Sequence, residues 1–198
     1  NVFNHVEDPH DFLKASKKIV KKNGIIILEV PDLDLLFKSV GFDTIYHEHR
    51  NYYSKNSINK LFKKNNLEII KIEKIDYMAG SLRIYSKNNK GKKNKFKYKN
   101  NLNKFKIFKK NIFKVKNKIL NFIKKNKDLN KTIVGIGAAT KGNTLINFCE
   151  INYKDIYCVL ERSPLKIGKF LPGSGIRILN EKKVKKYHAA IILPWNIT

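Results

Sequence analysis

The stretch TIYHEHRNYY, residues 44–53, carries the residues best suited to acid–base chemistry, because it places Tyr46, His47, Glu48 and His49 side by side. A histidine has an unperturbed pKa of about 6.5 and can therefore exchange protons near neutral pH. A neighbouring glutamate can orient an imidazole, and a tyrosine hydroxyl can donate to a developing oxyanion. With no cysteine or third histidine nearby, the stretch lacks the three or four ligands of a zinc site, and we predict no metal here. An acid–base centre and a polar surface loop remain the two interpretations.

A second candidate site is the glycine-containing sequence GIGAATKG, residues 135–142. Gly135 and Gly137 have the spacing of a dinucleotide-binding turn, but the next glycine, Gly142, comes too late for that fingerprint. Backbone N–H groups at the start of the following helix could still hold a phosphate, with Lys141 adding a positive charge. Glu161 ends the next expected strand, where nucleotide-binding folds often hold a ribose hydroxyl. Nucleotide or phosphate binding and a purely structural turn both stay open.

The elements that must position the first stretch alternate between helix and strand. We expect a helix over 9–23, a strand over 25–30 whose continuous apolar run is typical of burial on both faces, and a long loop with one short helix over 31–54. A helix capped by Ser54 follows over 54–66. Strands at 67–75 and 81–86, joined by a short turn around residues 77–80, predict an antiparallel edge on a parallel sheet.

The second half of the chain reads as a long helix followed by a smaller α/β unit. Residues 87–127 hold 17 Lys and no acidic residue. One apolar stripe nevertheless steps by three and four residues, and we interpret it as the packed face of a linker helix: Phe105, Phe108, Ile112, Val115, Ile119 and Phe122. A helix on a membrane surface, or one like those that calmodulin binds, is the alternative. From Lys131 onward, strands at 132–137, 156–161 and 189–194 with a helix at 139–149 predict a nucleotide-binding half-fold.

Composition restricts the classes of function. The formal charge is +26, but Lys makes up 38 of the 42 cationic residues. Arginine, which contacts phosphates in a bidentate manner, is scarce, so we predict no specific nucleic-acid partner. Cys149 and Cys158 are the only cysteines, which fits a reducing cytoplasm. No apolar run reaches the roughly 18 residues of a membrane span, and the start at Asn1, in the middle of what reads as a motif, leads us to expect a fragment.

Five motifs in order resemble one known family. GFDTIYHEHRNYYS, followed after a helix and a strand by GSLR, is similar to the C-methyltransferases that modify nucleotide-linked keto-deoxysugars. The opening NVFNHVEDPHDFL resembles the segment after the fourth sheet strand of that family. GIGAATKGNTLIN, ERSPLKIGKFLPGSGIRI and ILPWNI resemble its downstream motifs. Together the motifs cover nearly the whole chain except the Lys-rich tract.

The resemblance implies an α/β protein of three parts. Residues 1–87 would form the second half of a class I methyltransferase sheet that uses S-adenosyl-L-methionine, 88–130 a helical linker, and 131–198 a truncated Rossmann-like domain. Zinc is expected only in an N-terminal part that this chain lacks, together with the glycine motif that grips the methyl donor. The fragment alone would then be inactive. The implied partner is a nucleotide sugar, such as a thymidine-diphosphate sugar.

Carried onto matching positions, the resemblance nominates five residues around the reacting centre: Asn1, His5, Tyr46, Glu48 and His49. His49 is the candidate base, with His5 next, and it would remove the proton on the carbon beside the ketone. The resulting enolate would attack the methyl group, while Tyr46 or His5 donates to the oxyanion and Glu48 positions His49 or a sugar hydroxyl.

The remaining family motifs nominate residues that contact the substrate: Ser81, Arg83, Gly135, Gly137, Lys141, Asn143 and Glu161. Arg83 could equally be a cation on the surface of a strand. Met78 and Ala79 stand where the family has His and Gly, which puts the sugar accepted, or the activity, in question. Thr140 and Glu161 replace the usual Ala and Asp, which are mild changes.

Two other functions compete with this reading. The turn at residues 135–142 and Glu161 would suit an NAD- or nucleotide-binding oxidoreductase, although that leaves residues 46–49 unexplained. The high charge would suit a basic binding module without catalytic activity. The sequence leaves open the sugar, the carbon methylated, the pathway and the oligomeric state.

Overall fold

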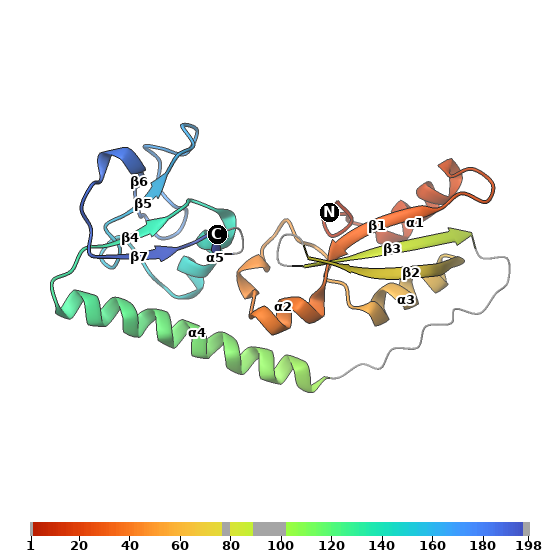
Figure 1. Cartoon of the computed structure of the whole chain (residues 1–198), viewed down its shortest axis with the longest axis horizontal. Coiled ribbons are helices and arrows are strands. Elements are labelled where there is room, and N and C mark those ends of the chain that lie inside the picture. The colour runs from red at the N-terminus through yellow and green to blue at the C-terminus, as the bar shows by residue number, and fades with distance from the viewer. Residues whose placement is uncertain (1, 77–79, 89–101, 196–198) are drawn as a thin grey trace. The chain divides into compact units, whose positions relative to one another are not determined.

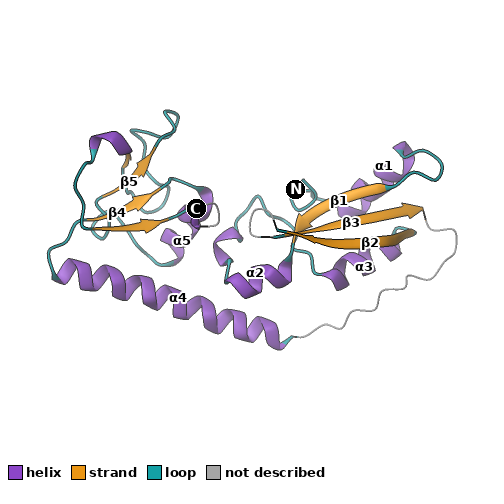
Figure 2. Cartoon of the chain, viewed as in Figure 1, coloured by secondary structure: helices purple, strands orange, loops and turns teal. Residues whose placement is uncertain are grey.

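A computed structural model describes residues 2–76, 80–88 and 102–195 (Figure 1). The chain divides into two compact units. The first comprises Asn1–Gly41 and His47–Lys106, and the second comprises Phe42–Tyr46 and Ile107–Thr198. Both units combine helices with a sheet (Figure 2), which confirms the α/β class. We keep the domain boundaries at 87/88 and 130/131 as a proposal.

The first unit contains a three-stranded sheet with the order β1-β3-β2. Its strands are β1 (Ile26–Pro31), β2 (Leu67–Ile75) and β3 (Ser81–Asn88). β3 lies between the other two strands and is antiparallel to both, so the predicted antiparallel pairing of the strands at 67–75 and 81–86 is confirmed. The parallel sheet predicted beside this pair is not formed by the described strands of the first unit, because β1 also pairs antiparallel with β3. Most of the turn expected between these strands, residues 77–79, lies outside the described residues.

One face of this sheet carries the core of the first unit, formed with the helices α1 (Pro9–Ile19) and α3 (Lys55–Lys64). The buried core residues of these elements form one cluster: Leu13, Ile26, Val30, Ile58, Phe62, Leu67, Ile69, Leu82 and Ile84. The prediction that the first strand is buried on both faces is wrong, because Ile27 is 55% exposed. Ile27 pairs with Tyr85 on the opposite face of the sheet, and side chains alternate between faces along a strand.

Helix α1 is shorter than the sequence predicted. Asp8 caps it, accepting from the N–H groups of His10 and Asp11. The expected stop at residues 23–24 is wrong, because Val20 is already extended. Gly24 N–H donates to the carbonyl of Lys21 at 2.8 Å and closes a separate turn.

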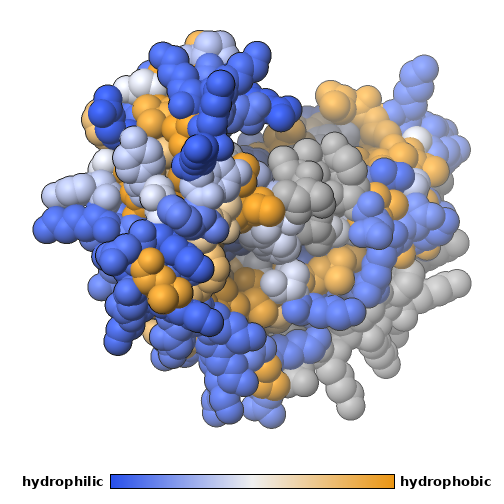
Figure 3. All heavy atoms as spheres, turned by 60° about the vertical axis from the view of Figure 1, so that its left-hand side comes forward, coloured by the Kyte–Doolittle hydropathy of each residue, from blue (hydrophilic) through white to orange (hydrophobic). Residues whose placement is uncertain are grey.

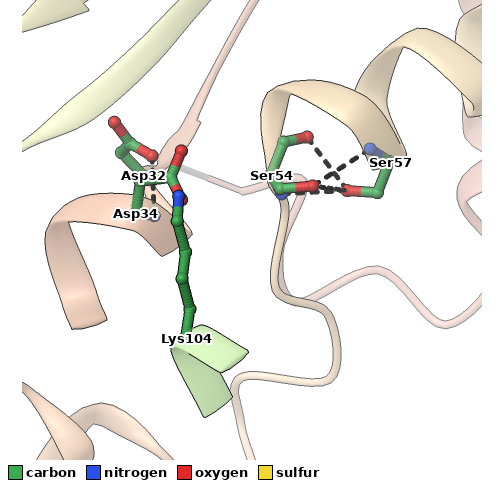
Figure 4. A network of polar contacts seen from close by, with 5 residues as sticks. All are labelled: Asp32, Asp34, Ser54, Ser57 and Lys104. Atoms are coloured by element: carbon green, nitrogen blue, oxygen red, sulfur yellow. Dashed lines mark hydrogen bonds and ion pairs between the residues drawn. The ribbon is translucent and has the colours of Figure 1, made fainter. Parts of the chain in front are cut away.

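The segment predicted as a long loop with one short helix contains two short helices, α2 (Leu33–Ser39) and the 3₁₀ helix η1 (Phe42–Thr44). Asp32 caps α2 by accepting from Asp34 N–H, and Ser54 caps α3 in a reciprocal capping box with Ser57 (Figure 4). Side chains that accept the free N–H groups at a helix start fix where the helix begins. The predicted cap at Ser54 is therefore confirmed.

The second unit contains a parallel four-stranded sheet with the order β6-β5-β4-β7. Its elements are β4 (Ile133–Ile136), α5 (Thr140–Phe148), β5 (Cys158–Glu161), β6 (Ile178–Asn180), η2 (Glu181–Lys183) and β7 (Ala189–Ile192). β4 lies between β5 and β7, so the chain reverses its direction of winding there, as in a nucleotide-binding half-fold. The sequence reading missed β6, whose three residues are too few to show a period.

Helix α4 (Asn103–Asp128) follows the predicted amphipathic pattern with one shift. Phe108 is buried and Ile112, Val115 and Ile119 are partly buried, but the predicted ends of the stripe are wrong. Phe105 and Phe122 are 54% and 40% exposed, whereas Ile123 is 4% exposed. Alternating steps of three and four residues average 3.5 residues per turn, whereas an α-helix has 3.6. The buried stripe therefore takes an extra step of four residues, from Ile119 to Ile123.

Among the coloured residues of Figure 3, hydrophilic ones predominate, with apolar residues between them. Among the described helices, none is both long and apolar enough to cross a membrane. Cys149 and Cys158 are buried free thiols. Burial raises the pKa of Cys149 to about 11 and also raises that of Cys158, so neither is a reactive thiolate at neutral pH.

Candidate active site

Two segments far apart in the sequence lie side by side in the first unit. Asn51 N–H donates to the carbonyl of Asn4 at 3.0 Å, and Asn51 Nδ2 donates to the carbonyl of Val6 at 2.7 Å. The rings of Phe3 and Tyr53 stack with centroids 5.1 Å apart. The segments 2–6 and 49–53 are thus fixed to each other by backbone, amide and aromatic contacts.

This arrangement brings His5 and His49 together. Their rings meet edge to face, with centroids 4.9 Å apart, and the ring of Tyr52 lies 6.3 Å from that of His49. Two imidazoles in contact can divide the roles of base and hydrogen-bond donor between them. The two histidines nominated for proton transfer therefore share one location.

The segment that carries His49 is anchored at the carboxyl end of β1. Tyr53 forms an isolated bridge with Asp32, the residue directly after this strand. Leu33 N–H donates to the carbonyl of Tyr53 at 3.1 Å, and Asp32 N–H donates to the carbonyl of Gly80 at 3.2 Å. Ligands of open α/β sheets bind beyond the carboxyl ends of strands, so this is the expected edge for a site.

The nominated catalytic residues differ in their exposure to solvent. His5 and Glu48 are exposed, and His49 is partly buried. Tyr46, also partly buried, belongs by its contacts to the second unit. Asn1 lies outside the described residues, as do Met78 and Ala79.

Three buried polar atoms on these same segments were missed by sequence reasoning. Asn4 Oδ1, Asp32 Oδ2 and the Tyr53 hydroxyl have no hydrogen-bond partner among the described residues. Burial strongly raises the pKa of Tyr53, so its hydroxyl keeps its proton and remains a donor. Buried polar atoms normally find a partner in protein, water or ligand. These three atoms are therefore candidates for contacting a ligand, and no local pattern in the sequence distinguishes them.

Ser81 and Arg83, nominated to bind substrate, lie on β3. Ser81 is buried at the first residue of the strand, opposite Pro31, and so lies at the same edge as the carboxyl end of β1. Arg83 donates from Nε and Nη2 to Glu29 Oε2 at 3.0 and 2.9 Å. This hydrogen bonding raises the pKa of Arg83 and fixes its side chain on the face of the sheet opposite to the core.

In the second unit, the glycines of residues 135–142 are required by close packing. A Cβ at Gly142 would lie 2.4 Å from Leu193 Cβ, and one at Gly137 would lie 2.8 Å from Pro194. Gly137 also has a φ of +81°, which side chains rarely adopt. A Cβ at Gly135 would lie 2.9 Å from Val159 Cγ2. The turn is thus pressed against β5 and the segment after β7.

Glu161 ties this turn to the neighbouring strand. Its carboxylate accepts from the N–H groups of Ala138 at 2.8 Å, Arg162 at 2.8 Å and Ser163 at 3.0 Å. Burial raises the pKa of Glu161, but the three N–H donors and Lys166 outweigh it, and the net shift is downward. The side chain thus has a structural function whether or not it also contacts a ligand.

Lys141 and Asn143 lie in the first turn of α5. Lys141 Nζ lies 4.8 Å from the centroid of the Trp195 ring, and burial lowers the pKa of Lys141 although Asp43 opposes this shift. Asn143 Oδ1 accepts from Asn147 Nδ2 at 3.3 Å. The helix start at Ala139 has no side-chain cap, so its first N–H groups are suited to an anion.

Within the residues that the structure describes, no group of three or more His, Cys, Asp or Glu is placed to hold a metal ion. A hollow on α1 is lined by Asp11, Lys14, Ala15, Lys17, Lys18 and Asn88. It contains none of the nominated residues.

Both halves of the chain match known protein families. Residues 1–72 match the family of the methyltransferase domain, and residues 77–198 match the C-methyltransferase C-terminal domain. The chain therefore belongs to the C-methyltransferase family. It is 27% identical over 217 residues to the C-methyltransferase NovU of Streptomyces niveus, an alignment that covers 98% of this chain and 50% of NovU. The chain thus spans about half the length of this curated relative.

Proposed function

We propose that this chain is part of an S-adenosylmethionine-dependent C-methyltransferase that acts on a carbon beside the ketone of a nucleotide-linked deoxysugar. The contact between His5 and His49 carries the proposal. A family that forms carbon–carbon bonds needs a base for a carbon acid and a donor for the oxygen that becomes negative. Two imidazoles beyond the carboxyl end of a strand can supply both groups.

His49 acts as the base and takes the proton from the carbon next to the ketone. The electron pair of that C–H bond moves into the enolate, and His5 or Tyr46 donates a hydrogen bond to its oxygen. The enolate carbon then forms a bond to the methyl group, while the donor's sulfonium sulfur leaves as a neutral thioether. His49 finally returns its proton to solvent. Glu48, exposed beside His49, positions this imidazole or a sugar hydroxyl, and Asn1 belongs to the same set.

The polar atoms at the sheet edge support binding of ligands there. Ser81 lies at this edge, and Asn4, Asp32 and Tyr53 offer buried polar atoms without described partners. Arg83 contacts the sugar or a phosphate when it exchanges its ion pair with Glu29 for one with the ligand. The methyl donor supplies an activated methyl group when bound.

The second unit supplies the nucleotide-binding role in this proposal. The uncapped start of α5 and the cation of Lys141 favour an anion such as a diphosphate, with Gly135, Gly137, Asn143 and Glu161 shaping the turn. The thymidine-diphosphate group is our preferred nucleotide. We also place the protein in the cytoplasm, on the strength of its two reduced, buried cysteines.

The test uses the intact protein with S-adenosylmethionine and a thymidine-diphosphate keto-deoxysugar. Mass spectrometry should show the sugar gaining one methyl group on carbon, and NMR should locate it beside the ketone. Solvent deuterium should enter the same carbon when the methyl donor is replaced by S-adenosylhomocysteine. Methylation on oxygen or nitrogen, or a reaction that requires NAD instead, would overturn the proposal.

A further inference from the structure

A buried carboxylate in the second unit is held by the only tryptophan of the chain. Asp43, in η1, is 2% exposed, and its Oδ2 accepts from Trp195 Nε1 at 2.6 Å. The two residues are 152 positions apart in the sequence. Burying a carboxylate costs several kcal/mol unless it is paired and hydrogen-bonded, so a position that retains one has a reason beyond packing.

The surroundings of Asp43 leave its charge incompletely compensated. Oδ1 has no hydrogen-bond partner among the described residues. Lys141, whose Nζ lies 4.8 Å from the centroid of the Trp195 ring, interacts electrostatically with Asp43. Burial raises the pKa of Asp43, and the Trp195 bond and Lys141 oppose that shift. A carboxylate that only served stability would be better replaced by an apolar side chain.

Asp43 lies in η1, and the nominated residue Tyr46 follows two residues after this helix. Phe42, beside it, is buried, and its ring lies 4.9 Å from that of Phe148 at the end of α5. Ile45 N–H donates to the carbonyl of Phe42 at 2.9 Å and closes the η1 turn. Tyr46 follows this turn at once. The aromatic contact anchors one end of the segment, and the Asp43–Trp195 bond restrains its orientation.

We propose that Asp43 and Trp195 are positioning residues that fix the η1 turn and thereby set the placement of the Tyr46 hydroxyl. This inference rests on the proposed function for its consequence in catalysis, since Tyr46 is there one of the two nominated donors to the enolate oxygen, with His5 as the other. The placement itself is a structural claim about the second unit. A misplaced donor costs more in the transition state than in the bound substrate, so its loss lowers kcat more than it changes KM.

The test uses 3-fluorotyrosine-labelled intact protein, with the Tyr46→Phe variant to assign the Tyr46 fluorine resonance. Asp43→Ala and Trp195→Phe should each shift or broaden that resonance and lower kcat at least about tenfold, with KM changed less. Asp43→Asn keeps an oxygen that can accept from Trp195 Nε1, and it should retain the Tyr46 resonance and most of kcat. Asp155→Ala is the matched control: this carboxylate pairs with Lys127 at 2.8 Å, and its removal should leave the resonance in place.

An unmoved Tyr46 resonance in a folded Asp43→Ala or Trp195→Phe protein overturns the inference. If Asp43→Ala does not fold, the Tyr46 resonances of Trp195→Phe and Asp43→Asn are sufficient to test the inference. Failure of the proposed function would appear differently, as a wild-type protein that methylates no nucleotide-linked ketosugar. In that case the fluorine spectra still decide whether Asp43 and Trp195 place Tyr46.

Discussion

The imidazole rings of His5 and His49 meet edge to face with their centroids 4.9 Å apart, although 44 positions separate them in the chain. The backbone bond between Asn51 and Asn4 and the stacking of Tyr53 on Phe3 hold this pair in place. Neither histidine can change its position without disturbing a contact to the other segment. We therefore predict that the two imidazoles act together in experiments that measure proton transfer.

Replacing His49 by Gln should abolish exchange of solvent deuterium into the carbon beside the ketone. The loss of a general base lowers the rate by about 10²–10⁴-fold, which NMR of the recovered substrate would detect. His10→Gln is the control, because His10 contacts Asn65 at 2.9 Å in the same unit and has no proposed role in catalysis. Wild-type exchange in His49→Gln would remove His49 from the role of base.

His5→Gln should slow the same exchange, and the His5→Gln/His49→Gln double variant should be little slower than His49→Gln alone. Residues that act together in one step give effects that are far from additive. The measurement is the exchange rate in all four proteins of the cycle. Additive effects would mean that the two rings, although in contact, act independently.

The packing of Gly142 on Leu193 leads to a prediction for stability. The Cβ of an alanine at 142 would lie 2.4 Å from Leu193 Cβ, so Gly142→Ala should destabilise the second unit by about 1–3 kcal/mol. Leu193→Ala alone should cost about 2–5 kcal/mol, because this side chain is fully buried. The double variant shortens the side chain at 193 but keeps its Cβ, so it should relieve only part of the strain, with urea unfolding as the measurement. A Gly142→Ala protein as stable as the wild type would show that the helix moves away without cost.

Glu161 leads to a prediction for pH dependence. Its pKa in the folded protein is below the usual value of about 4.3, with burial opposing the donors Ser163, Arg162 and Ala138. A lowered pKa means that the unfolded chain binds the proton more tightly, so the stabilisation is complete above the unfolded value. It is then lost as the pH falls through the folded pKa.

Glu161→Gln should therefore lower the free energy of unfolding of the second unit at pH 7 by about 1–3 kcal/mol. The difference from wild type should shrink as the pH falls below about 4.3. Hydrogen exchange of β4 and β5 measures this locally. Glu7→Gln is the control, because Glu7 is an exposed partner of Arg50. A difference that stays constant with pH would mean that the charge of Glu161 does not stabilise the turn.

Local periodicity was enough to predict most of the elements but not the contacts between distant residues. The strand 67–75 and the cap at Ser54 follow from alternation and from a hydroxyl that accepts free N–H groups, both of which are local. The C-terminal end of α1 and the three residues of β6 were not predictable in this way. They depend on Val20 turning away and on pairing with β5.

In the candidate site, too, contacts between distant residues could not be predicted from local sequence patterns. The nomination of His5 beside His49 came from family resemblance, because spacing in the chain cannot bring residues 5 and 49 together. The bond of Asp43 to Trp195 and the buried atoms of Asn4 and Tyr53 had no signal in the sequence. Their significance appears only once burial and hydrogen-bond partners are known.

Helix α4 provides a matched pair of neighbouring residues that tests where its apolar stripe lies. Ile123 is 4% exposed, whereas Phe122, which the strict 3-4 pattern placed in the stripe, is 40% exposed. Ile123→Ala should lower the free energy of unfolding by about 2–5 kcal/mol, and Phe122→Ala by about 1 kcal/mol or less, although it removes the larger side chain. Alanine favours a helix at both positions, so propensity does not separate the two variants. Urea unfolding, monitored by hydrogen exchange of α4, measures the free energy of unfolding of both variants. A greater decrease in Phe122→Ala than in Ile123→Ala would mean that Phe122 belongs to the buried stripe, as the strict 3-4 pattern predicts.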